Sequence, residues 1–213
     1  GEHIFAYVSP RRFPKAVDAD WGSRVVFLND HFCVVNKPGG VPSIPRADNQ
    51  AESCVASVNR HLHAAGKLGG RIPGGQESWL NAVHRLDLPT HGLLILARSN
   101  AFRKHFAFLM RGRNVHKRYR ALTASPPPLG DMHHLMKPST WCPKVLARDL
   151  AHAAGSGPPG GSAERATEDT RGWLSCHLRV LTVKKIPASH LTPHALSLLQ
   201  ASTPSEGGEE VLR

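Results

Sequence analysis

A six-residue apolar run, from Gly92 to Ala97, constrains the fold more than any other feature of this sequence. The run reads GLLILA, and turn-forming residues lie on both sides of it. A short, continuous apolar run bounded in this way is typical of a buried strand. The sequence therefore predicts a strand inside the core at residues 92–97.

The other apolar patterns predict further short strands and two helices. Residues 24–28 and 32–37 are apolar runs separated by the turn signal Asn29-Asp30, which is typical of a β-hairpin. Further strands are expected at residues 80–86, 119–123 and 173–183, and helices at residues 51–66 and 100–112. Short strands mixed with helices predict an α+β fold, with a mixed but mainly antiparallel sheet and flanking helices.

The charge of the chain points to a polyanionic partner. The 213 residues include 27 basic and 16 acidic side chains, which gives a formal net charge of +11. Nucleic acid is the usual partner of such a chain. The charge alone leaves a simpler interpretation open, in which it serves solubility or suits a basic ribosomal environment.

Other classes of function receive no support from the sequence. The cysteines lie outside any C-x-x-C spacing and the histidines outside any H-E-x-x-H spacing, so we expect no metal. No run approaches the roughly 18 apolar residues that a membrane span needs, and no signal peptide is visible. We therefore expect a protein without a membrane partner.

Arg85 and Asp87 flank Leu86 just before the buried strand. In extended backbone, residues i and i+2 share a face, so the two charged side chains can project to one side. Catalytic groups are often found on such turns, where a rigid sheet holds them. The simpler interpretation, which spacing alone leaves open, is that Asp87 caps a turn and Arg85 forms a surface ion pair.

Residues 84–99, HRLDLPTHGLLILARS, resemble the catalytic signature of RNA pseudouridine synthases of the RluA type. That signature is HRLD, two variable residues, Thr, a small residue, Gly-Leu, and an apolar strand that ends in Ala and a basic residue. His91 stands where the family usually carries serine. Three further segments agree in the same order, and the resemblance covers about residues 22–185: an early hairpin at 25–38 with VVNKP, a K-x-Y-x-A segment at 117–121, and a following segment at 130–144.

The resemblance implies roles for five residues. Asp87 is the expected nucleophilic carboxylate, which attacks the target uridine at the ribose or at the base ring. Arg85 is expected to hold the RNA after the uridine flips out, and Tyr119 to pack against the flipped base. Thr90 and Lys117 are expected to contact the substrate. For Tyr119, a half-buried strand tyrosine is the simpler interpretation.

Basic residues on the second expected helix and after it are expected to contact phosphates. They are Arg103, Lys104, Arg111, Arg113, Lys117, Arg118 and Arg120. Taken singly, such charges usually mark a solvated face. As a cluster they agree with the net charge of the chain.

The same resemblance gives the expected domain organisation. We expect an N-terminal extension at 1–22, the first part of a catalytic domain at 23–154, a disordered insert at 155–172, a continuation of the domain at 173–200 and a disordered acidic tail at 201–213. The family's later signature, with a sense like TGRTHQIR, supplies a basic partner for the catalytic aspartate. We find no match to it after Lys185, and so expect the domain to be incomplete, or the chain truncated, on its C-terminal side.

Three functional hypotheses follow. The first is a monomeric isomerase that converts specific uridines of structured rRNA or tRNA to pseudouridine and is expected to need no cofactor and no metal. The alternative is an RNA-binding protein with weakened or no catalysis, because the C-terminal signature is missing. The third is a basic structural protein, for example of an organellar ribosome. The sequence leaves the compartment open between an organelle (chloroplast or mitochondrion), the cytosol and the nucleus.

Overall fold

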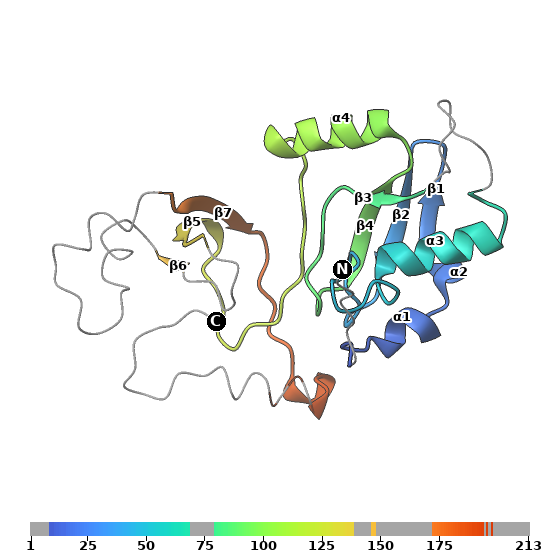
Figure 1. Cartoon of the computed structure of the whole chain (residues 1–213). Coiled ribbons are helices and arrows are strands. Elements are labelled where there is room, and N and C mark those ends of the chain that lie inside the picture. The colour runs from blue at the N-terminus through green and yellow to red at the C-terminus, as the bar shows by residue number, and fades with distance from the viewer. Residues whose placement is uncertain are drawn as a thin grey trace, which may run out of the picture. The chain divides into compact units, whose positions relative to one another are not determined.

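The computed structural model describes residues 9–68, 79–138, 146–147 and 172–193, together with residues 195 and 197. The chain divides into two compact units, Gly1–Arg118 and Tyr119–Arg213. The first unit contains a four-stranded sheet and the second a three-stranded sheet, as labelled in Figure 1. Every strand pair among the described residues is antiparallel. The predicted α+β class with a mainly antiparallel sheet is therefore confirmed.

The sheet of the first unit has the strand order β1-β2-β4-β3. Its strands are β1 (Val25–Leu28), β2 (Phe32–Lys37), β4 (Gly92–Ala97) and β3 (Asn81–Ala82). The predicted hairpin is confirmed as β1 and β2, and the predicted buried strand is confirmed as β4. The strand predicted at 80–86 is wrong beyond Ala82, because the chain bends away from β4 at Val83.

One face of this sheet packs on helix α3 (Cys54–Ala64), which confirms the first predicted helix. Ser53 caps α3, because its side chain accepts a hydrogen bond from the backbone N–H of Ala56. Leu94 and Leu96 of β4 and Val58 of α3 are completely buried in the same apolar cluster. Burial of this kind is the main favourable term in folding.

Helix α4 (Asn100–Arg111), drawn above the first sheet in Figure 1, packs on the face opposite to α3. The ring of Phe102 stacks on that of Phe32, with centroids 4.7 Å apart, and Phe32 alternates along β2 with the core residue Cys33. Ser99 caps the helix by accepting a hydrogen bond from the N–H of Phe102 at 3.2 Å. The second predicted helix is therefore confirmed, including its end at Gly112.

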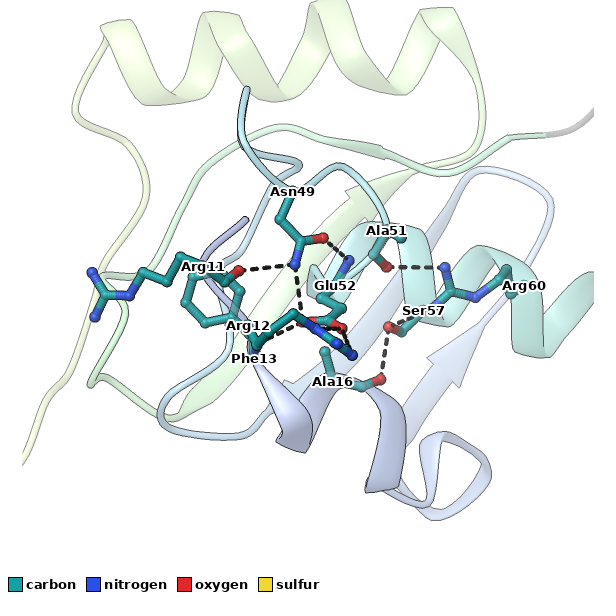
Figure 2. Close-up of polar contacts among 9 residues, drawn as sticks. All are labelled: Arg11, Arg12, Phe13, Ala16, Asn49, Ala51, Glu52, Ser57 and Arg60. Atoms are coloured by element: carbon teal, nitrogen blue, oxygen red, sulfur yellow. Dashed lines mark hydrogen bonds and ion pairs between the residues drawn. The ribbon is translucent and has the colours of Figure 1, made fainter. Parts of the chain in front are cut away.

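The segment before β1 forms two short helices, α1 (Pro14–Asp18) and α2 (Trp21–Arg24). Phe13, Ala16 and Trp21 are buried in the core of the first unit. Figure 2 shows how polar contacts fasten this segment to the region before α3. The carboxylate of the buried Glu52 accepts hydrogen bonds from Arg12 and from the backbone N–H of Phe13. The residues expected as an extension thus include part of the core.

The second unit contains β5 (Gly130–Met136), β6 (Leu146–Ala147), β7 (Leu174–Val180) and the 3₁₀ helix η2 (Ala188–His190). The strand predicted at 173–183 is confirmed as β7, though it is shorter. Residues 119–123 are described and form no strand, so that prediction is wrong. The predicted insert lies outside the described residues, apart from Gly172, and the predicted tail at 201–213 lies wholly outside them.

Within the ranges given above, none of the helices is both long and apolar enough to cross a bilayer.

Candidate active-site loop

The loop between β3 and β4, residues 83–91, carries the predicted nucleophile. Its backbone is irregular at residues 85–87, where Arg85 and Asp87 are exposed while Leu86 is only 8% exposed. This alternation agrees with the expectation that the two charged side chains project away from the core. Within the described part of the chain, no hydrogen bond or ion pair engages the carboxylate of Asp87. The carboxylate is thus free to meet a ligand.

Ser43 holds the middle of this loop to the body of the first unit. Its hydroxyl accepts a hydrogen bond from the backbone N–H of Leu86 at 3.0 Å and donates one to the carbonyl of Leu86 at 2.7 Å. Both groups are buried, where an unpaired backbone group is unfavourable by about 1–3 kcal/mol. One side chain therefore fixes the residue that lies between Arg85 and Asp87.

Lys37, at the end of β2, contacts the next part of the loop through a hydrogen bond to the carbonyl of Leu88. Its side chain is completely buried, and its ammonium group donates to the carbonyls of Pro38 at 3.1 Å, Val41 at 2.8 Å and Leu88 at 3.4 Å. Burial lowers the pKa of Lys37, whereas Cys54 and Asp87 act in the opposite direction. A buried cation is thus tied by its three donors to the backbone on both sides of the site.

The two glycines after Pro38 allow the segments at 38–43 and 85–90 to approach closely. The N–H of Gly40 donates to the carbonyl of Leu88 at 2.8 Å. A Cβ at Gly39 would lie only 2.8 Å from the carbonyl oxygen of Pro89, which is closer than real side chains come. Gly40 also has φ +83°, a conformation that favours glycine. The Pro38-Gly39-Gly40 turn is therefore shaped to support the loop.

The other residues of the predicted site have separate places. Thr90 is half-buried and its N–H donates to the carbonyl of Asp87 at 3.1 Å, which closes the turn after the carboxylate. Lys117 is exposed in the first unit, close enough for its charge to lower the pKa of His84. Tyr119 is the first residue of the second unit, where it is 62% exposed. His91 is exposed and does not pack in the core.

The predicted basic surface is solvent-exposed throughout. All seven of its members are exposed: Arg103, Lys104 and Arg111 on α4, Arg113, Lys117 and Arg118 after it, and Arg120 in the second unit. Ion-pair partners for them are absent among the described residues. These cations are therefore available to an anionic ligand.

Cys33 and Cys54 lie in the core of the first unit and are poor nucleophiles. Burial raises the pKa of Cys33 to about 11 and that of Cys54 to about 12. A thiol needs to ionise before it attacks, so both stay inert near neutral pH. No cluster of three or more His, Cys, Asp or Glu side chains able to hold a metal is found in the described ranges.

Sequence reasoning overlooked Lys37 and Ser43 as parts of the site. Lys37 stood inside the VVNKP segment, but a lysine at a strand end usually reaches solvent. The apolar run that precedes Lys37 was a weak signal of its burial. Ser43 lies 43 residues before Leu86, so nothing in the sequence connected the two.

Known proteins resemble this chain over most of its length. The sequence model of the RNA pseudouridylate synthase family matches residues 31–198. RNA pseudouridine synthase 6, chloroplastic, of Arabidopsis thaliana is 30% identical over 187 residues, which are 88% of this chain and 33% of that protein. Ribosomal large subunit pseudouridine synthase D of Zymomonas mobilis is 35% identical over 105 residues, 49% of this chain and 32% of that protein.

A third relative is the dual-specificity RNA pseudouridine synthase RluA of Escherichia coli, which is 29% identical over 96 residues, 45% of this chain and 37% of that protein. The matches span about a third of the length of each of these relatives. The resemblance to the RluA type is thereby confirmed. Since the family match extends over 31–198 and includes the HRLD loop, the chain belongs to the RNA pseudouridylate synthase family.

Proposed function

We propose that this protein converts uridine to pseudouridine in structured RNA, with Asp87 as the nucleophile. The observation that carries the proposal is an exposed carboxylate on a loop that the buried Lys37 and Ser43 hold from beneath. A nucleophile has to reach its substrate and yet be held in place, and this arrangement meets both needs. Membership of the family supports the same reaction.

The reaction is an isomerisation and needs no added oxidant or reductant. In the proposed course, the carboxylate of Asp87 attacks the uridine at the ribose or at the base ring, and the glycosidic C–N bond breaks. The base then turns, and a C–C glycosidic bond forms at its C5 atom. The C5 hydrogen leaves as a proton, and the nitrogen of the broken glycosidic bond gains a proton. The carboxylate departs unchanged. Covalent catalysis of this kind divides a difficult step into two easier ones.

Arg85 and Tyr119 are proposed to handle the flipped nucleotide. Removing a base from its stack costs a few kcal/mol, and a guanidinium can fill the gap or contact phosphate. Arg85 is exposed two residues before Asp87, which suits it to this task. An exposed tyrosine offers a face on which a base can stack, and this supports a role for Tyr119. Thr90 is proposed to shape the turn beside the substrate.

The exposed cations of α4 and the following segment are proposed to bind the phosphates of the RNA. The names of the relatives refer to the ribosomal large subunit, to dual specificity and to the chloroplast, and we propose rRNA or tRNA as the substrate and an organelle as the compartment. Imaging of a fluorescent fusion of the full-length protein tests the compartment. A signal confined to cytosol or nucleus contradicts it.

The test compares the wild-type protein with Asp87→Asn on RNA labelled with tritium at C5 of uridine. The probe is total RNA from cells that lack this protein, since its unmodified sites are then available. We expect the wild type to release tritium and Asp87→Asn to be slower by roughly 10³-fold or more. Filter binding of the same RNA at several salt concentrations should give equal slopes for both proteins.

The alternative function makes a different prediction in the same experiment. If the wild-type protein binds this RNA with a steep salt dependence but releases no tritium, it is an RNA-binding protein without catalysis. If it does not bind at moderate salt, RNA is the wrong partner. Arg85→Ala serves as a control, because it should weaken the handling of the substrate while it keeps the nucleophile.

A further inference from the structure

His84, the first residue of the HRLD segment, points into the unit rather than towards solvent. Its ring is half-buried, and its Nε2 accepts a hydrogen bond from the backbone N–H of Ile95 at 3.0 Å. The ring also lies against Phe106 of α4, with centroids 5.8 Å apart. The imidazole therefore touches both the central strand β4 and the helix that covers it.

The place of this hydrogen bond in the sheet is informative. In the β3–β4 ladder, Asn81 lies opposite Ala97 and Ala82 opposite Leu96, so Val83 would be next, opposite Ile95. The backbone bends away at that point instead, and among the described residues no strand pairs with Ile95 on this side. The imidazole supplies the acceptor that a longer β3 would otherwise provide, so the N–H of Ile95 does not remain unpaired.

We propose that the neutral imidazole of His84 is a positioning residue that ends the β3–β4 ladder and so sets the start of the loop that carries Asp87. This inference rests on the proposed function for its effect on catalysis. Asp87 follows His84 by three residues, and the next fixed point is Leu86, which Ser43 holds. A shift at His84 therefore passes directly into the backbone that presents Arg85 and Asp87.

The protonation state of His84 decides whether this contact exists. Nε2 can accept the N–H only while it carries no proton. Burial lowers the pKa of His84 and the charge of Lys117 lowers it further, whereas a backbone hydrogen bond with Arg85 raises it. Phe106 from α4 and the backbone of Ile95 from β4, which pack against the ring, do not titrate. The ring is therefore neutral at neutral pH and loses its acceptor when acid protonates it.

The variants His84→Leu and His84→Gln separate positioning from bulk. Leucine fills space without an acceptor, whereas the amide oxygen of glutamine can replace Nε2. We expect His84→Leu to lower kcat for tritium release about 10- to 100-fold, with little change in RNA affinity. His84→Gln should keep a kcat within about threefold of that of the wild type. Val58→Ala, a buried change in α3, serves as a control that loses stability but keeps kcat.

Two further readouts test the contact of His84 with Ile95 more directly. The kcat of the wild type should fall as the pH drops below the ordinary histidine value of 6.5, while that of His84→Gln should keep its value over the same range. Hydrogen exchange at the amide of Ile95 should be slow in the wild type and in His84→Gln, and faster in His84→Leu. The exchange measurement on the wild type and His84→Gln stands even if His84→Leu does not fold.

Several outcomes overturn the inference. They are a fast-exchanging Ile95 amide in the wild type, His84→Gln as slow as His84→Leu, and an acid limb that is the same in wild type and His84→Gln. Failure of the proposed function looks different, because then no protein, including the wild type, releases tritium. In that case the exchange of Ile95 still decides whether His84 ends the ladder.

Discussion

The two units of this protein bury their strands to very different degrees. In the first unit, Val35 of β2 and Leu94 of β4 are completely buried between the sheet and α3. In the second unit, β5 and β7 pair along seven positions, yet Leu174 and Leu178 of β7 remain 51% and 50% exposed. Among the described strands, the longer hydrogen-bonded ladder therefore leaves its side chains more exposed.

This difference shows what a ladder needs in order to hold a loop rigidly. Backbone hydrogen bonds exchange for bonds to water on unfolding, so their net contribution is small, about 0.5–1.5 kcal/mol each. Small sheets without a packed face are marginal on their own. The loop of Asp87 is anchored to the unit with the buried core, where Lys37 and Ser43 can be held rigidly.

The largest expected difference between the two units comes from truncating one leucine in each of them. We expect Leu94→Ala to destabilise the first unit by about 2–5 kcal/mol, because it leaves a cavity in the core. Leu178→Ala, at a side chain of β7 that is half exposed, should have a much smaller effect, of about 0.5 kcal/mol. Hydrogen exchange of peptides from each unit measures both effects. Equal effects would mean that the face of β7 is buried in solution.

Replacement of the buried lysine is the next largest effect. Lys37→Met keeps the length of the side chain but removes the donor to the carbonyls of Pro38 and Val41 and one of the two donors to that of Leu88, so we expect a loss of about 2–3 kcal/mol. Tritium release should fall as well, since Leu88 adjoins Asp87. The exposed Lys67→Met is the matched control and should stay within about 0.5 kcal/mol in urea denaturation. A stable, fully active Lys37→Met protein would contradict the role given to this side chain.

The smallest effect concerns two carboxylates, one in each unit. Hydrogen bonds from Arg12 and Phe13 lower the pKa of Glu52 to about 2, from an ordinary value of 4.5. Contacts with Arg179 and His177 hold the pKa of Asp131 well below its usual range. A carboxyl group whose pKa is lower in the folded than in the unfolded protein stabilises the fold at pH values above its unfolded pKa. This stabilisation disappears as the pH falls towards its folded pKa.

For Glu52 that window lies between about pH 4.5 and pH 2. We expect the wild type to lose stability across it, whereas Glu52→Gln should be less stable at neutral pH and flatter across the window. Asp131→Asn should alter only the second unit, and the exposed Asp18→Asn should alter neither. Urea denaturation across this pH window measures the free energy of unfolding, and hydrogen exchange shows in which unit it changes. An unchanged acid profile in Glu52→Gln would remove Glu52 as its cause.

Much of the fold followed from local patterns. The helices α3 and α4 and the strands β2 and β4 lie where apolar periodicity predicted them. The strand predicted at 80–86 failed for a reason that is not local. That segment looked strand-like throughout, but the side chain of His84 occupies the hydrogen-bonding position of β4 and diverts the chain after Ala82. Local sequence does not reveal which partner a backbone group will choose.

The candidate site likewise has residues that the sequence predicted and residues that it did not. Arg85 and Asp87 were found from a motif that is continuous in the chain, and their exposure on either side of Leu86 agrees with simple alternation. The roles of these residues remain predictions. The support that Ser43 gives to the loop was not predicted from the sequence. Ser43 and Leu86 are 43 residues apart and meet only when two loops come together.

The sequence by itself determined the family, the α+β class, the basic character and the carboxylate to test, because each of these depends on neighbouring residues or on composition. Only the tertiary structure decided how that carboxylate is held: a lysine with no access to water, a serine that binds both backbone groups of Leu86, and a histidine that ends a strand. The physical reason is that buried polar groups need partners, and the folded chain brings those partners from distant positions.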